Sequence, residues 1–130
     1  SIALSQHFKV GKSIPWKTSE TWGVKVVSAV LKEGWPKNVL LNVNVPDRSV
    51  GKVKGIIAVK QGEHEVFDAV EERIDPRGRT YYWVGQGHAE DVQGMRGTDL
   101  RAVNEGYVAV TPLHLDLTHR PTLARFRKVF

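Results

Sequence analysis

The chain contains no cysteine and only one methionine, Met95, among its 130 residues. Without cysteine it can form no disulfide framework, thiolate metal site or cysteine nucleophile. The absence of disulfides fits a reducing compartment, so we expect a cytoplasmic protein. No apolar run approaches the roughly 20 residues that a membrane-spanning helix needs, and no basic stretch followed by an apolar run marks a signal peptide.

Long blocks of like charge are also missing, although the chain is basic, with a formal net charge of +5. A basic balance favours anionic partners such as nucleotides, phosphate esters or nucleic acid. Basic side chains scattered over a solvated surface would give the same net charge. The composition therefore leaves both interpretations open.

The first five residues, Ser1-Ile2-Ala3-Leu4-Ser5, are largely apolar and contain no initiator methionine. Domains usually begin at polar, exposed termini. We therefore expect residues 1–5 to be an inner strand of a larger α/β enzyme whose N-terminal portion is absent.

Hydrophobic periodicity predicts an alternation of strands and helices. Residues 38–46 and 107–112 read as strands, and residues 55–60 as a strand buried on both faces, because they are nearly all apolar. Residues 18–32 show helical spacing of Trp22, Val26, Val27, Val30 and Leu31, with Thr18 or Ser19 as N-cap and Gly34 as the stop.

Two shorter helices are predicted nearer the C-terminus. Thr98 or Asp99 can cap a helix that runs to about residue 105, where Gly106 ends it. After Pro121, residues 122–130 form a predicted terminal helix that Thr122 could cap.

A turn at Asp75-Pro76-Arg77-Gly78 joins residues 66–74 to residues 79–84 in a predicted β-hairpin. Proline presets the first turn angle, aspartate bonds its own backbone and glycine adopts the exit conformation. We place the whole hairpin at about residues 61–85, followed by a glycine-rich loop at about residues 86–97. Long loops of this kind are often functional.

Arg96, Gly97 and Thr98 at the end of this loop form a candidate phosphate site, because helix N-termini attract anions. The segment is neither a Walker loop nor a dinucleotide fingerprint. Asp99 would repel phosphate, so a simple capped turn is the alternative.

The segment from His114 to His119 is the densest cluster of candidate ligands. His114, Asp116 and His119 could hold a divalent ion, but their spacing aligns them on neither a strand nor a helix. An Asp116–His119 hydrogen bond that pins the C-terminal arm is the alternative. The serines include no nucleophile elbow, so the residues by themselves indicate no catalytic centre.

Several stretches resemble, in order and spacing, the SurE family of stationary-phase survival proteins. The matching pieces are Ser1-Ile2-Ala3-Leu4-Ser5, Leu41-Asn42-Val43-Asn44-Val45-Pro46, Lys54-Gly55-Ile56, Asp75-Pro76-Arg77-Gly78-Arg79, Tyr82-Trp83-Val84-Gly85, Gly97-Thr98-Asp99-Leu100, Ala102-Val103, Glu105-Gly106-Tyr107-Val108, Thr111-Pro112-Leu113 and Asp116-Leu117-Thr118. Together they cover nearly the whole chain.

The resemblance implies the C-terminal part of a Rossmann-like α/β domain over residues 1–130, with a projecting hairpin and a C-terminal arm at about residues 113–130. Both extensions would serve a homodimer or homotetramer. The complete enzyme would hydrolyse nucleoside monophosphates with Mg²⁺ or Mn²⁺. The family's metal ligands precede the segment that matches Ser1, so no catalytic, cofactor or metal residue is carried over, and this segment by itself is expected to be inactive. His119 follows Thr118 directly, whereas family members often have another residue between them.

A second hypothesis is a self-contained basic module that binds nucleotides or nucleic acid without catalysis. The net charge supports it. The chain lacks the interleaved aromatic and basic residues of a stacking platform, which makes a nucleic-acid partner the less favoured choice.

Overall fold

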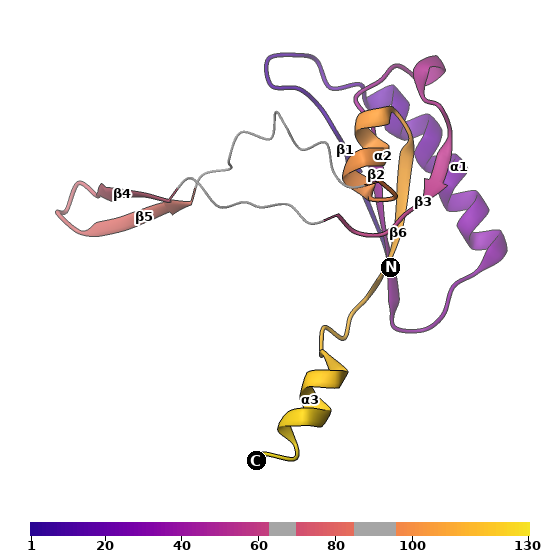
Figure 1. Cartoon of the computed structure of the whole chain (residues 1–130). Helices are drawn as coiled ribbons and strands as arrows, with labels where there is room; N and C mark the ends of the chain where they lie inside the picture. The colour runs from indigo at the N-terminus through magenta and orange to yellow at the C-terminus, as the bar shows by residue number, and fades with distance from the viewer. Residues whose placement is uncertain (63–69, 85–95) are drawn as a thin grey trace.

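The computed structural model describes residues 1–62, 70–84 and 96–130. Its centre is a mixed sheet in the order β1-β2-β6-β3 (Figure 1). Strands β1 (Ile2–Gln6) and β2 (Val39–Val45) are parallel, while β6 (Val108–His114) runs antiparallel to β2. The short strand β3 (Ile56–Ala58) is parallel to β6. The predicted α/β architecture is confirmed.

Helix α1 (Trp16–Glu33) connects the two parallel strands and covers one face of the sheet. Its buried Val26 packs into a cluster with the inward valines of the strands, and Trp22 and Val30 pack against the edge of that cluster. Leu31 has helical spacing suited to this stripe but is 66% exposed. Strand residues alternate between faces, so Asn42 and Asn44, both half-buried, belong to the opposite face. The cluster's strand and loop members are Val43, Val45, Val53, Val108 and Val110.

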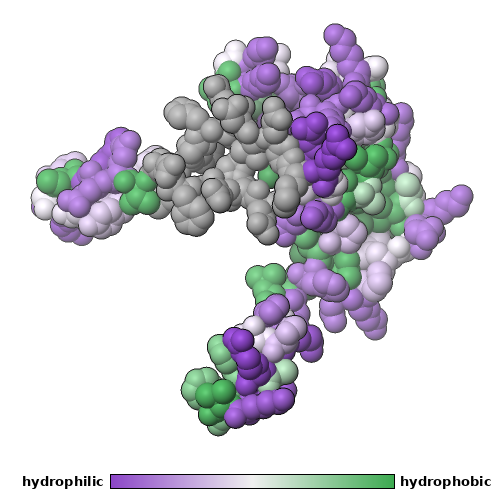
Figure 2. All heavy atoms as spheres, in the orientation of Figure 1, coloured by the Kyte–Doolittle hydropathy of each residue, from purple (hydrophilic) through white to green (hydrophobic). Residues whose placement is uncertain are grey.

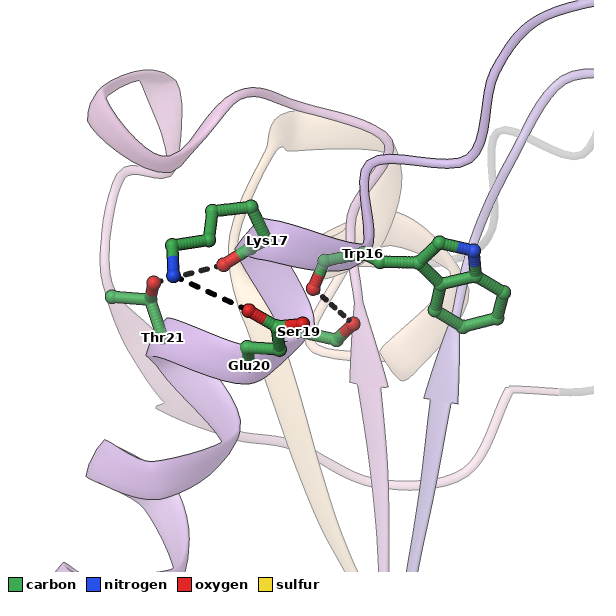
Figure 3. Close-up of polar contacts among 5 residues, drawn as sticks. All are labelled: Trp16, Lys17, Ser19, Glu20 and Thr21. Atoms are coloured by element: carbon green, nitrogen blue, oxygen red, sulfur yellow. Dashed lines mark hydrogen bonds and ion pairs between the residues drawn. The ribbon is translucent and has the colours of Figure 1, made fainter.

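The start of α1 differs from the prediction. Pro15 occupies the N-cap position and no side chain caps the helix, so the expected cap by Thr18 or Ser19 is wrong. Both residues already lie inside the helix, and their hydroxyls donate to carbonyl oxygens. Ser19 Oγ reaches Trp16 O at 2.9 Å (Figure 3), and Thr18 Oγ1 reaches Arg48 O at 2.7 Å.

The rest of the first turn is held locally. The Thr21 hydroxyl donates to Lys17 O at 2.8 Å, and Lys17 Nζ pairs with Glu20 at 3.3 Å (Figure 3). At the far end, Gly34 takes a positive φ of 76° and donates its N–H to Val30 O, which confirms the predicted stop.

Strand β3 is not buried on both faces, contrary to the prediction. It lies at the outer edge of the sheet, where its only neighbour among the described strands is β6. Ile56 is therefore 39% exposed, although it lies opposite the fully buried Val108. The apolar composition of residues 55–60 indicates a strand. How far that strand is buried depends on its position in the sheet, which the composition does not show.

The predicted hairpin is confirmed as β4 (Val70–Ile74) and β5 (Thr80–Val84), which pair antiparallel. Gly78 has a φ of +79° and donates its N–H to Asp75 O at 2.9 Å. The Asp75 carboxylate accepts the N–H groups of Arg77 at 2.8 Å and Arg79 at 2.9 Å. Residues 63–69 of the predicted first arm and residues 85–95 of the predicted loop lie outside the described residues.

Helix α2 (Asp99–Glu105) follows the prediction. The Thr98 hydroxyl accepts from Arg101 N, and Gly106 ends the helix with a φ of +94°. A 3₁₀ turn, η1 (Val50–Lys52), lies between β2 and β3. None of the helices in the described parts of the chain is both long and apolar enough to span a membrane.

Helix α3 (Arg120–Phe126) begins two residues earlier than predicted. His119 occupies its N-cap position, so the expected cap by Thr122 is wrong. Figure 1 shows α3 leading away from the sheet after β6, and the β4–β5 hairpin standing away from it in another direction.

Candidate functional site

A cavity of about 120 Å³ lies beside the carboxyl ends of the two parallel strands. His7 and Lys9 follow β1, Asp47 and Arg48 follow β2, and the last turn of α2 closes the cavity with Val103 and Asn104. Ligands in α/β sheets bind in the crevice outside the carboxyl ends of parallel strands. The cavity is therefore the candidate site that the architecture favours.

Gln6 holds the two strand ends together. Its side-chain Nε2 donates to the carbonyl oxygens of His7 at 2.8 Å and of Pro46 at 3.1 Å. The His7 N–H continues the sheet by donating to Val45 O at 2.8 Å. One glutamine amide thus fixes the spacing between the two backbones that carry the cavity residues.

The backbone of Arg48 is hydrogen-bonded through both its N–H and its carbonyl oxygen. Its N–H donates to Pro46 O at 2.8 Å, and its carbonyl oxygen accepts the Thr18 hydroxyl. Its side chain runs past Gly106, where an added Cβ would lie 3.5 Å from Arg48 Nε. An alanine there would only touch the arginine, so it is the φ of +94° at residue 106 that favours glycine.

The cavity is positively charged and open to solvent. Lys9 and Arg48 carry two positive charges, and Asp47 carries one negative charge. Lys9 and Arg48 can donate to an anion, while Asp47 can accept from a hydroxyl group. Among the described residues, those that line the cavity include no hydroxyl or thiol nucleophile, and their two cations suit the binding of an anion.

At the candidate phosphate loop, the first backbone amides of α2 already donate hydrogen bonds to oxygen atoms of the protein itself. Asp99 N donates to Lys60 O at 3.0 Å, and the Asp99 carboxylate accepts Leu100 N at 2.9 Å and Gly62 N at 2.7 Å. The Thr98 hydroxyl accepts Arg101 N at 3.4 Å. The backbone at Arg96, Gly97 and Thr98 therefore favours the capped turn over a phosphate site.

Asp116 and His119 of the C-terminal arm, which the sequence predicts as a pair, are bonded to other groups. Asp116 accepts from Thr118 N at 2.9 Å and from Arg120 Nη2 at 2.6 Å. His119 Nδ1 lies 2.7 Å from Thr122 Oγ1. The expected Asp116–His119 hydrogen bond is therefore wrong, because the start of α3 brings Arg120 one turn from Asp116. The hydroxyl and amide of Thr118, followed by Arg120, lower the pKa of Asp116 below its ordinary value.

The described residues do not gather three His, Asp or Glu side chains into a group that could hold a metal ion. His114, Asp116 and His119 therefore do not converge as ligands. Sequence reasoning missed His7, Lys9, Asp47 and Arg48 altogether. Their positions directly after two predicted strands were the available signal, since strand ends are where α/β sheets place ligands.

Comparison with known proteins matches the chain over most of its length. The model of the family described as Survival protein SurE matches residues 1–68. The 5'-nucleotidase SurE of Hyphomonas neptunium is 43% identical over 131 residues, covering 98% of this chain and 51% of that protein. The 5'-nucleotidase SurE of Paramagnetospirillum magneticum is 42% identical over 130 residues, covering 100% of this chain and 50% of that protein.

The crystal structure of the SurE protein from Aquifex aeolicus superposes with a TM-score of 0.70 at 36% identity, covering 98% of this chain and 50% of that one. The chain thus spans about half the length of the relatives it matches. The match includes the sheet, both strand ends at the cavity and the C-terminal arm. On its sequence and its fold, the chain belongs to the SurE family.

Proposed function

We propose that the complete protein is a metal-dependent nucleotidase that hydrolyses nucleoside monophosphates, and that this chain supplies part of its sheet and one wall of its site. Similarity to proteins named 5'-nucleotidase along the whole chain carries the proposal. The cavity at the carboxyl ends of β1 and β2 supports it, because that edge is where α/β enzymes bind substrates. A cytoplasmic location is part of the same proposal.

The described residues do not fit a Mg²⁺ or Mn²⁺ site, since no group of three candidate ligands converges among them. The ligands would come from other parts of the complete protein. Because the resemblance places the family's metal ligands before the segment that matches Ser1, residues 1–130 by themselves should lack phosphatase activity.

The test is phosphate release from nucleoside monophosphates by the complete protein, with Mg²⁺ or Mn²⁺ and with a chelator. We expect turnover that the chelator abolishes, and none from residues 1–130. Failure of the complete protein to release phosphate would refute the nucleotidase. Metal-dependent turnover by residues 1–130 alone would refute the proposal that the metal ligands lie outside this chain.

We further propose that the hairpin and the C-terminal arm form contacts in a homodimer or homotetramer. Figure 2 shows hydrophobic side chains on the outside of both segments. Exposed apolar surface marks interaction sites where it is contiguous, so the apolar side chains of these segments are candidates for such contacts. The exposed residues are Val70, Ile74, Tyr81, Tyr82 and Trp83 on the hairpin, and Leu115, Leu117, Leu123, Phe126, Val129 and Phe130 on the arm.

Replacing residues 70–84 with a short glycine linker should reduce the oligomer in sedimentation velocity without changing the far-UV circular dichroism of the sheet and helices. If the variant sediments as the same oligomer as the original protein, the assembly role is contradicted.

A salt titration of nucleic-acid affinity tests the alternative of a basic binding module, because phosphate-driven binding weakens steeply with salt.

A further inference from the structure

The cavity between the ends of β1, β2 and α2 joins two cations to a carboxylate, and the proposed function does not say which part of a substrate they contact. We infer that this cavity is a subsite for the phosphate group of a nucleoside monophosphate, held by Arg48 and Lys9. This inference rests on the proposed function for the identity of the nucleotide.

Arg48 is suited to be the anchor. Both its N–H and its carbonyl oxygen are bonded to the chain, so its backbone is held in place. Within the described residues, its guanidinium donates only one bond, from Nη1 to Asp47 O at 3.3 Å. The remaining N–H groups form a planar fork that matches two phosphate oxygens.

Lys9 approaches the cavity from the other strand end. The turn in which it lies is closed by Lys12 N donating to Lys9 O at 3.1 Å. Because β1 and β2 are adjacent and parallel, a ligand at their ends contacts residues from both loops. Two cations from independent loops make an anion subsite better defined than a lone surface lysine.

Size and charge limit what the cavity can hold. Its volume of about 120 Å³ is roughly four times the volume that a water molecule occupies in the liquid. A phosphate group can therefore enter it, while the opening to solvent leaves space outside for the rest of a nucleotide. Asp47 opposes the two cations, so the cavity keeps one net positive charge for an anion, and the Asp47 carboxylate can accept a hydrogen bond from a sugar hydroxyl. This combination selects a single phosphate attached to a hydroxyl-bearing sugar over a polyphosphate or a nucleic-acid backbone.

The experiment measures binding of orthophosphate, adenosine monophosphate and adenosine to the complete protein, in the presence of a chelator so that no metal site contributes. Isothermal titration calorimetry gives the Kd, and amide chemical shifts give the location. We expect the two phosphate-bearing ligands to bind and to shift the signals of Lys9 and Arg48, while adenosine does not displace orthophosphate. Phosphate affinity should fall as ionic strength rises.

Arg48→Gln and Lys9→Gln should each weaken the Kd by about tenfold, the effect of losing one charge-assisted hydrogen bond at a partly exposed site. Lys32→Gln is the matched control, because Lys32 lies in the last turn of α1 at the opposite end of the sheet. It should leave the Kd within about twofold of the original value, since exposed charges at this distance are screened. Lys9→Gln in its exposed loop keeps the test decisive if Arg48→Gln fails to fold.

Unchanged phosphate affinity in Lys9→Gln and in a folded Arg48→Gln, or chemical-shift changes confined to other residues, would overturn the inference. If the complete protein binds phosphate through Arg48 but releases none from nucleoside monophosphates, the nucleotidase is refuted and the subsite is retained. Normal turnover with an unchanged KM in both variants would refute the subsite and retain the nucleotidase. A polyphosphate or single-stranded RNA that binds more tightly than adenosine monophosphate through Arg48 would refute the single-phosphate preference.

Discussion

The hydroxyl of Thr18 in the first turn of α1 donates to the main-chain carbonyl of Arg48, 2.7 Å away and beyond the end of β2. Thr18 is almost completely buried, whereas the Arg48 side chain is exposed at the rim of the cavity. One hydrogen bond therefore connects the helix that covers the core to the segment that carries the anchoring cation. Packing of α1 and the geometry of the cavity are consequently coupled.

Thr18→Val should destabilise the protein by about 1–2 kcal/mol. Valine keeps the shape of threonine but leaves the Arg48 carbonyl without this donor in a partly buried position. Urea unfolding measures the difference. Thr21→Val is the matched control, because its hydroxyl donates only to Lys17 O within the same exposed turn. Its cost should stay below about 0.5 kcal/mol, and equal costs for the two variants would contradict the coupling.

Gly106→Ala should cost about 1–2 kcal/mol, because residue 106 has a φ of +94° that L side chains disfavour. The added Cβ would also lie 3.5 Å from Arg48 Nε, so the amide signals of Arg48 should shift. Gly51→Ala provides the comparison, since Gly51 has ordinary φ and open space around it. It should change the unfolding free energy by no more than about 0.5 kcal/mol. Similar effects at both positions would show that the left-handed conformation is not the cause.

Val43→Ala should lower the unfolding free energy by about 2 kcal/mol. Val43 is completely buried between α1 and the sheet, so the substitution removes two buried methyl groups and leaves a cavity. Val24→Ala on the exposed side of α1 should have an effect below about 0.5 kcal/mol. Equal losses at the two positions would be incompatible with the observed orientation of α1.

The hairpin turn should loosen in acid. The Arg79 amide contributes most to lowering the pKa of Asp75, followed by the Arg79 side chain and the Arg77 amide. A carboxylate with a lowered folded-state pKa stabilises the fold above its unfolded pKa, and this contribution is lost as pH falls through the folded pKa. Carboxyl-carbon NMR titration should place the Asp75 midpoint below that in the urea-unfolded protein.

Arg79→Gln should raise the Asp75 midpoint only in part, because the substitution retains the amide that contributes most. Asp75→Asn should remove the acid dependence of the Gly78 amide signal. If the wild-type midpoint equals that of the unfolded protein, the turn does not depend on this carboxylate.

Local chemistry made several features predictable. The turn at Asp75-Pro76-Arg77-Gly78 needs only its own backbone and side chains, and it forms as predicted. Thr98 and Gly106 bound α2 for the same reason, since capping groups act within one turn. Residues 38–46 were likewise predicted as a strand, and β2 forms at Val39–Val45.

Contacts across the chain decided the rest. Thr18 looked like a helix cap but bonds Arg48, 30 residues away, because sheet formation brings the end of β2 to the start of α1. Asp116 pairs with Arg120 rather than His119, because the start of α3 sets the angle of the arm. The sequence by itself determined the family through the order of its motifs. It also determined the strands and the turns, because these depend on residues that are neighbours in the chain. Only the tertiary structure joined Lys9 to Arg48 across the strand ends, because residues 39 positions apart become neighbours when two parallel strands pair.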